Sequence, residues 1–302
     1  MNDFPAFYLG PRMLATGSLY DPAAFLAKQR ELLGYVCVNI QFVRLPYVAV
    51  ILSPLSRLPY SAAYAIWQLL SVASLAVFAW LWPARRAVAL LICCWFPPVA
   101  ANLANGQDVT YLLLSVAIAA WLVPRGREFA AGLVLSLCAA KFHLCLFLPV
   151  LIVARRMWRL GAGLASGAAV LLGISFLAAG ASWPSAYLQT LRSPAVNPGM
   201  SKSSLVAVAM ATLHGPALWA FLAGLMLLAG LIVYRVAQRH SFPLALGAAL
   251  AGGPIVAFHV YSQDYLLMLP LLLTLVSGAL SRARNSHSYG PANPGSSQPS
   301  LR

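Results

Sequence analysis

The segment SAAYAIWQLLSVASLAVFAWLW, residues 61–82, decides the fold class of this chain. It runs for 22 residues without a charged side chain, and about 20 mainly apolar residues suffice for an α-helix to cross the hydrocarbon core of a membrane. Pro59-Tyr60 precedes it and Pro83 follows it, which limits the helix at both ends. The segment therefore predicts a transmembrane helix.

The rest of the chain repeats this pattern. Hydrophobic residues make up 61% of the sequence and charged residues only 9%, whereas a soluble domain carries about 25% charged residues. Further apolar runs cover residues 87–103, 109–123, 128–154, 157–179, 216–234, 242–257 and 265–280. They are too long for the strands of a β-barrel. We expect an all-α, polytopic helical membrane protein with about seven to nine membrane segments.

Arginine clusters between the apolar runs indicate the topology. The net charge is +14, and short basic clusters beside apolar spans are typical of cytoplasmic loops that face anionic lipid rather than of nucleic-acid binding. The clusters expected on the cytoplasmic side are Arg85-Arg86, Arg125/Arg127, Arg155/Arg156/Arg159, Arg235/Arg239 and Arg282/Arg284. The other side then holds residues 1–60, 105–108, a loop over 180–204, and 259–264, while 205–213 predicts a short interfacial helix.

Residues 128–154 require a hairpin on this topology. Arginines flank the segment on both sides, so it has to cross an even number of times, yet its 27 residues give only about 40 Å of helix. We expect a re-entrant or bent pair of half-helices with Lys141-Phe142-His143 at the apex, buried in protein or lining a cavity. One long span is the alternative. Residues 1–280 are expected to form a single membrane-embedded domain, with 1–60 outside and 61–280 as the bundle, followed by a disordered cytoplasmic tail over 281–302.

The six carboxylates are the best clue to a site. Five of them are expected on the outer side, namely Asp3, Asp21, Glu31, Asp108 and Asp264, and only Glu128 is expected elsewhere. Ionisable residues beside membrane spans mark either helix ends or functional sites. No nucleotide-binding, nucleophile-elbow or metal-ligand motif occurs in the sequence, and the five cysteines predict buried apolar thiols rather than disulfides or a zinc site.

Four short stretches carry the candidate site residues. In the first, Asp3 and Tyr8 precede an Asp21-Pro22 pair that could be an ordinary turn. In the second, Asn105-Gly106-Gln107-Asp108 forms a turn in which Gln107 or Asp108 could cap the helix from residue 109.

The other two stretches hold the candidate groups for a phosphate. Lys141 and His143 lie inside an apolar run, where Lys141 suits a phosphate partner or snorkels to the interface. His259 and Asp264 follow Gly252-Gly253-Pro254, which is expected to end the preceding helix. An aromatic belt with an aspartate cap is the alternative interpretation of the His259–Asp264 stretch.

Taken together, these stretches resemble glycosyltransferase family 87, the polyprenyl-phosphate-mannose-dependent enzymes of the GT-C class. The resemblance extends over roughly residues 3–280. It rests on the ordered series Asp3-Phe4-x-x-Phe7-Tyr8, Gly17-x-Leu19-Tyr20-Asp21-Pro22, Leu52-x-Pro54-Leu55 through Leu58-Pro59 to Ala65-x-Trp67, Asn105-Gly106-Gln107, Ala131-Gly132-Leu133 to Lys141, Arg155-Arg156-x-Trp158, and Gly253-Pro254 to Asp264-Tyr265.

The resemblance implies an inverting hexosyltransferase, with mannose as the expected hexose, that uses a polyprenyl-phosphate donor and a lipid or glycan acceptor. Asp3 would be the general base, Lys141 and His259 would receive the phosphate, and Asn105 and Gln107 would bind sugar or acceptor. Supporting roles would fall to Asp108, Asp264, Tyr8 and His143. No metal or other cofactor is implied. The expected location is a bacterial-type plasma (inner) membrane, with the active face extracytoplasmic.

One departure from the family matters. Family members carry a membrane helix before the Asp3-type residue, so we expect such a helix upstream of this sequence; without it, Asp3 should lie on a frayed terminus and be poorly held. The N-terminus also shows no signal peptide. A non-enzymatic lipid or small-solute transporter, or an inactive truncated glycosyltransferase, remains the alternative, although the internal repeats typical of transporters are not evident.

Overall fold

A computed structural model describes residues 2–36, 40–192, 204–257 and 259–288, and these residues form helices and connecting loops without a strand. The all-α prediction is therefore confirmed. The first three helices are α1 (Phe4–Ala15), α2 (Pro22–Leu33) and α3 (Pro46–Ser56). The bundle follows with α4 (Tyr60–Leu81), α5 (Arg86–Trp95), α6 (Pro97–Ala104), α7 (Val109–Leu122), η1 (Val123–Arg125), α8 (Glu128–Leu135), η2 (Ser136–Leu144), α9 (Leu148–Arg155) and α10 (Trp158–Ala179). The last elements are α11 (Trp183–Arg192), α12 (Leu205–Thr212), α13 (Gly215–Arg239), α14 (Phe242–Val256), η3 (Ser262–Met268) and α15 (Leu269–Ser288).

The molecule is a polytopic helical membrane protein. Among the described residues, four helices are long and apolar enough to span a membrane, and there are five when α5 and α6, bent by 59° at Phe96, count as one span. The shorter apolar segments 109–125 and 242–256 pack in the same bundle. The expected seven to nine segments include these shorter helices and the hairpin of residues 128–154.

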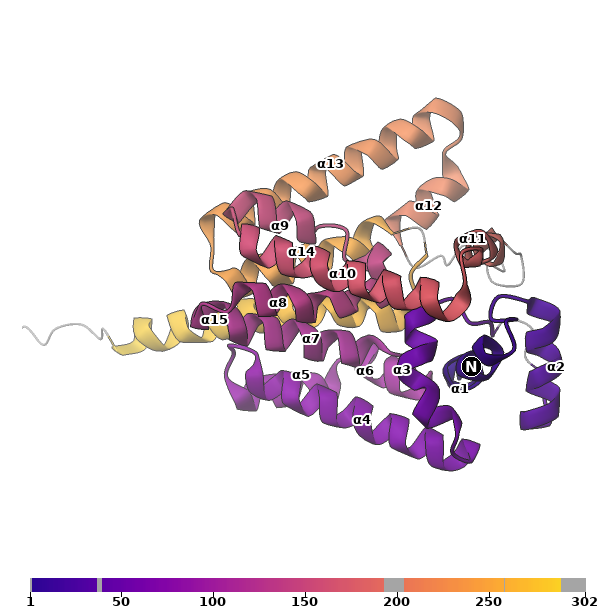
Figure 1. Cartoon of the computed structure of the whole chain (residues 1–302). Coiled ribbons are helices and arrows are strands. Elements are labelled where there is room, and N and C mark those ends of the chain that lie inside the picture. The colour runs from indigo at the N-terminus through magenta and orange to yellow at the C-terminus, as the bar shows by residue number, and fades with distance from the viewer. Residues whose placement is uncertain (1, 37–39, 193–203, 258, 289–302) are drawn as a thin grey trace, which may run out of the picture.

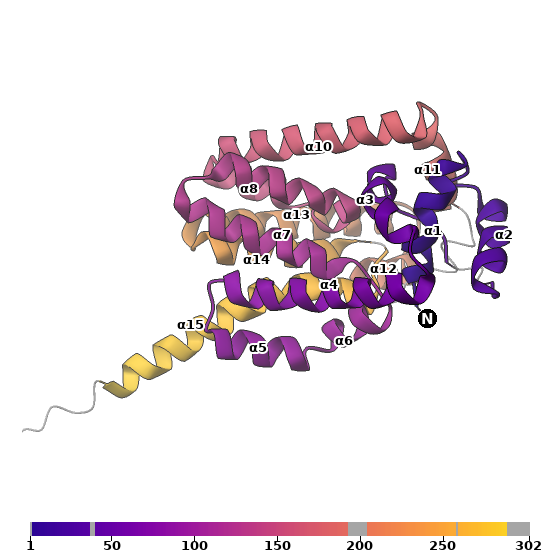
Figure 2. The ribbon, with the colours of Figure 1, turned by 60° about the horizontal axis from the view of Figure 1, so that its bottom comes forward.

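The arginine clusters gather at one end of the bundle, as expected. Figure 1 shows the connections α4–α5, α7–α8, α9–α10 and α13–α14 at the end from which the last turns of α15 emerge, and α1–α3, α11 and α12 at the opposite end. Figure 2 shows the same separation after rotation. Contacts agree with this view, because the Arg155 side chain donates to the carbonyl oxygens of Ala237 and His240 at 2.9 and 2.8 Å.

The segment 128–154 forms the expected hairpin, and its second arm, α9, ends one residue later at Arg155. Gly132 and Gly163 bring α8 and α10 into backbone contact, since a Cβ on either would overlap a carbonyl oxygen of the other helix. At the other arm, Ile152 of α9 lies against Gly161 near the start of α10. Both arms therefore end beside the start of α10. The chain reverses between them at Lys141, whose φ of −133° and ψ of 52° interrupt the helix.

Three local expectations were wrong. The predicted 180–204 loop contains helix α11, while residues 193–203 lie outside the described part. The predicted disordered tail is helical up to Ser288, and residues 289–302 lie outside the described part. Gly252-Gly253-Pro254 does not end α14, which continues to Val256. A Cβ at Gly253 would overlap the carbonyl oxygen of Leu144, so this glycine lets α14 pack on the hairpin bend.

Candidate functional site

The N-terminus of α1 is anchored on the turn between α6 and α7. Gly106 has a left-handed φ of +59°, and a Cβ there would lie 2.6 Å from the Asn2 Oδ1 atom. The backbone N–H of Asp3 donates to the Asn105 carbonyl oxygen at 2.8 Å. The Trp67 Nε1–H group donates to the Gly106 carbonyl oxygen at 3.0 Å. Asp3 is therefore held by backbone contacts, and the expectation that it would lie poorly held on a frayed terminus was wrong.

Aromatic packing against α4 also holds the N-terminus of α1 in place. The Phe4 ring, which is fully buried, lies 5.2–5.7 Å from the rings of Tyr60, Tyr64 and Trp67. Burying a Phe side chain of this kind contributes roughly 1.5–3 kcal/mol. The contacts fix the residue that follows Asp3, and so they hold the first turn of α1 against α4.

A buried ionic network lies next to Asp3. Arg44, just before α3, binds Asp108 through two contacts, Nε to Oδ2 at 2.8 Å and Nη2 to Oδ1 at 3.1 Å. Lys141, at the hairpin bend, lies 3.5 Å from Asp108 and 2.5 Å from Asp264. All four side chains are at least nine-tenths buried. Two cations thus neutralise two carboxylates in the interior.

Gln107 links this network to Asp3. Its Oε1 atom accepts from Lys141 Nζ at 3.3 Å and from Arg44 Nη2 at 3.4 Å. Its Nε2 group donates to Asp3 Oδ2. Residues from the start of α1, the α6–α7 turn, the hairpin bend and η3 therefore meet in one hydrogen-bonded cluster.

The electrostatics separate Asp3 from the other acids. Burial raises the pKa of Asp3 above its usual value, and this exceeds the opposing effects of the Gln107 hydrogen bond and the charges of Arg44 and Lys141. Burial acts in the same direction on Asp108, but Arg44 and Lys141 outweigh it and lower the pKa of Asp108. Within the described part of the chain, Asp3 takes part in no ion pair.

Asp264 and Asn105 occupy supporting positions. The Asp264 carboxylate binds Lys141 through Oδ1 and accepts the backbone N–H of Tyr261 through Oδ2 at 2.9 Å, so it closes the first turn of η3 as well. The Asn105 Nδ2 group donates to Gln263 Oε1 at 3.2 Å, which joins the α6–α7 turn to η3. Neither side chain has a contact with the Asp3 carboxylate among those the structure describes.

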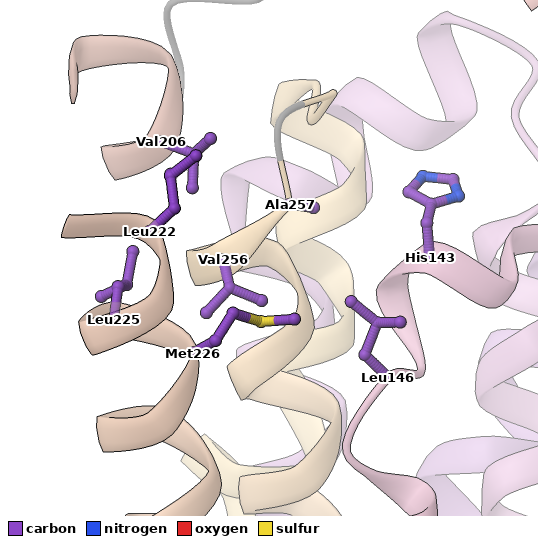
Figure 3. A pocket seen from close by; sticks show the side chains of 8 residues that line it. All are labelled: His143, Leu146, Val206, Leu222, Leu225, Met226, Val256 and Ala257. Carbon is purple, nitrogen blue, oxygen red and sulfur yellow. The ribbon is translucent and has the colours of Figure 1, made fainter. Parts of the chain in front are cut away.

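The two candidate histidines, His143 and His259, lie at the edge of the network. His259 is half-buried, its ring stands edge-on to that of Tyr261 at 4.8 Å, and burial lowers its pKa despite the charge of Asp264. His143 lines an apolar cavity of about 190 Å³ between the hairpin bend, α12, α13 and α14 (Figure 3). The other lining side chains are Leu146, Val206, Leu222, Leu225, Met226, Val256 and Ala257.

Several expectations for individual residues need correction. Asp108 does not cap α7, and neither does Gln107; the Asn102 Oδ1 atom accepts the Val109 N–H at 3.2 Å instead. Lys141 does not snorkel, because it is only 4% exposed and is bound to carboxylates. Tyr8 does not join the site; its hydroxyl donates to the Leu58 carbonyl oxygen at 2.8 Å and braces α1.

Two further roles became visible only in the structure. Arg44 completes the network. It lies in the segment 1–60, which is expected on the non-cytoplasmic side, where the positive-inside rule disfavours basic residues. Asp21, treated above as a turn residue, caps α2 by accepting the backbone N–H groups of Ala23 and Ala24. The charge-rule violation was the one available signal for Arg44, because an arginine outside the basic clusters needs a partner of its own.

Comparison with known proteins identifies the family. The model of glycosyltransferase family 87 matches residues 45–284, which include Gln107, Lys141 and Asp264, whereas Asp3 and Arg44 precede the match. Searches of curated proteins and of solved structures gave no significant match. Because the matched region covers most of the chain, this protein belongs to glycosyltransferase family 87 and is a membrane glycosyltransferase.

Proposed function

We propose that this glycosyltransferase moves a hexose, with mannose as the expected sugar, from a polyprenyl-phosphate donor to a lipid or glycan acceptor at the extracytoplasmic face of a bacterial-type plasma membrane. The observation that carries the proposal is the connected set Asp3, Gln107, Lys141 and Asp264. Asp3 directly precedes α1, which lies at the end of the bundle opposite the arginine clusters (Figure 1). By the positive-inside rule, that end faces away from the cytoplasm.

Asp3 is the proposed general base. A base has to be ionised and able to accept a proton, and Asp3 is the acid of the network that is held by an amide instead of a cation. Its carboxylate would take the proton of an acceptor hydroxyl while that oxygen attacks the anomeric carbon. The bond from this carbon to the phosphate oxygen would break in the same displacement, and its electron pair would leave with the lipid phosphate. A single displacement inverts the anomeric configuration.

The leaving phosphate needs donors on the other side of the sugar. Lys141 and His259 are the proposed groups, but the structure adds a condition for Lys141. Its ammonium already binds Asp264 and lies near Asp108, so a phosphate would have to join or displace a carboxylate. His259 is half-buried, and its lowered pKa favours the neutral ring, which would donate one N–H group.

The apolar cavity supports a donor with a lipid chain. Seven of its eight lining residues are hydrophobic, and His143, two residues from Lys141, is the eighth. The cavity lies between α12, α13, α14 and the hairpin bend that also carries Lys141 (Figure 3). An isoprenoid chain attached to a phosphate combines the same two properties, whereas a nucleotide-sugar would present polar groups to these walls.

The test is hexosyl transfer in membranes that contain the full chain, with radiolabelled polyprenyl-phosphate-hexose as donor and nucleotide-hexose as the comparison. We expect transfer from the lipid-linked donor alone. Asp3→Asn should lower turnover by roughly 10²–10⁴-fold, the usual contribution of a general base. Glu31→Gln makes the same chemical change at an exposed carboxylate in the N-terminal region and should be silent. Equal turnover in the Asp3→Asn and Glu31→Gln proteins would remove Asp3 as base, and transfer from the nucleotide donor would refute the proposed donor class.

A further inference from the structure

Gln107 has both ends of its amide occupied by protein groups. Two cations, Arg44 and Lys141, approach the Oε1 atom at 3.4 and 3.3 Å, and the Asp3 carboxylate approaches Nε2. The side chain is only 6% exposed. A sugar hydroxyl would have to displace one of these partners in order to bind Gln107, which makes the role expected from the sequence, sugar or acceptor binding, a costly one.

The cations fix the orientation of the amide. An amide can present either its oxygen or its NH₂ group to a neighbour, and only the oxygen can accept hydrogen bonds from Arg44 and Lys141. With the oxygen committed to them, Nε2 necessarily faces Asp3. Rotation of the amide by half a turn would place NH₂ against two cations and a carbonyl oxygen against a carboxylate, so both contacts would become repulsive.

We propose that Gln107 is a positioning residue that holds the Asp3 carboxylate by means of an amide whose orientation is set by Arg44 and Lys141. The inference rests on the proposed function, in which Asp3 is the base. The two cations polarise the amide, and its Nε2–H group donates a hydrogen bond to the Asp3 carboxylate. This bond favours the ionised form of Asp3 without pairing Asp3 directly with a cation. A direct cation would hold Asp3 so strongly ionised that it would accept a proton poorly.

The surroundings of Asp3 are consistent with this arrangement. The charged and titratable groups that act on it are Arg44 from the segment before α3, Lys141 from the hairpin bend, the N-terminal amino group, and Tyr261 from the segment before η3. Gln107 is the side chain that hydrogen-bonds its carboxylate, and the Asn105 carbonyl oxygen holds its backbone. Among the described residues, removing the amide therefore removes the one side-chain donor to the Asp3 carboxylate.

The experiment is a pH–rate profile of hexosyl transfer by the full chain in membranes. In Gln107→Leu, kcat should fall roughly 10- to 100-fold, the value of one hydrogen bond to a charged group. The KM for the donor should change little. The acidic limb of the profile should move to higher pH, because the ionised form of Asp3 has lost its donor. Gln68→Leu is the matched control, since Gln68 bonds to Tyr64 and Leu103 outside the network.

A second variant separates positioning from loss of structure. Gln107→Glu keeps an acceptor for Arg44 and Lys141 but turns an acceptor towards Asp3, so the two carboxylates must share a proton at low pH. We expect an acidic limb displaced further upwards, with activity partly recovered at high pH. A raised donor KM with an unmoved acidic limb in both variants would overturn the proposal and return Gln107 to substrate binding.

The failure of the proposed function would be recognised separately. If the wild-type chain transfers no hexose, the ionisation of Asp3 can still be followed as the infrared carboxyl band that disappears in Asp3→Asn. Gln107→Leu should shift the titration of this band to higher pH. A band that titrates identically in the wild-type and Gln107→Leu proteins would refute the positioning role whatever the reaction is.

Discussion

The pair Arg44–Asp108 should be strongly coupled, and its two partners should not be equivalent. Asp108→Asn leaves the buried Arg44 guanidinium without the carboxylate that binds it at 2.8 and 3.1 Å. Arg44→Met leaves Asp108 with Lys141 at 3.5 Å as a second cation. Breaking a buried ion pair costs about 3–5 kcal/mol. We therefore expect Asp108→Asn near the upper end of this range and Arg44→Met near the lower end.

The double variant should be less unstable than the two single variants predict together. Arg44→Met with Asp108→Asn removes one charge of each sign and leaves Lys141 balanced by Asp264. Lys141 and Asp264 then still pair with each other, so the coupling free energy should reach about 3 kcal/mol in favour of the double variant. Such a value would mean that most of the cost of each single change comes from the partner that stays behind.

The assay is reversible unfolding of the full chain in mild detergent, followed by tryptophan fluorescence, for the wild type, both single variants and the double variant. Lys28 and Glu31 supply the matched control. They form an ion pair at 2.8 Å, but their side chains are 30% and 60% exposed, so their coupling should stay below about 0.5 kcal/mol. If Arg44 and Asp108 couple as weakly as this control pair, the reasoning that the interior must neutralise Asp108 is wrong.

Two further predictions concern the hairpin and the proposed base. Gly163→Ala should destabilise the protein by about 1–3 kcal/mol in the same unfolding assay, because the added Cβ would overlap the Phe129 carbonyl oxygen. Gly173→Ala in the same helix is the control. Nothing lies within 4 Å of its added Cβ, so this variant should be neutral or slightly stabilised. Hexosyl transfer should be lost as the pH falls through the pKa of Asp3; since burial raises this pKa above the usual 3.8, the acidic limb should lie at higher pH than an ordinary aspartate would give. A pH–rate profile measures this, and a limb that is unchanged in Asp3→Asn would assign it to another group.

The membrane spans and their relative directions in the bundle could be predicted because they depend on local properties. The length of an apolar run determines whether a helix can cross the membrane, and the arginine clusters determine which helix ends lie on the same side. Both features can be recognised in contiguous stretches, such as residues 61–82 and 155–159. The hairpin followed from the same rule, since arginines flank it on both sides. This also placed Asp3, Gln107 and Asp264 at one end of the bundle, which the hydrogen-bond network confirms.

The pairings inside the site could not be predicted because they join residues far apart in the chain. Lys141 and Asp264 are separated by 123 positions and Arg44 and Asp108 by 64, and no periodicity specifies which acid meets which cation. The glycine pair Gly252-Gly253 was misinterpreted for a related reason. It breaks helices in water, but inside a bundle a neighbouring backbone, here that of Leu144, can make glycine a packing requirement instead.

The charge balance of the site constrains how any phosphate-linked donor can bind. Arg44 and Lys141 are matched by Asp108 and Asp264, and Asp3 adds one more negative charge when it is ionised. A donor phosphate therefore enters a region without surplus positive charge among the described network residues, and Asp264 competes with it for Lys141. The same balance keeps Asp3 free of a direct cation, which a base requires. On the proposed function, the carboxylates around Lys141 therefore weaken its binding of the donor phosphate, while Asp3 stays able to accept a proton. Much of the donor's binding free energy then has to come from its apolar chain.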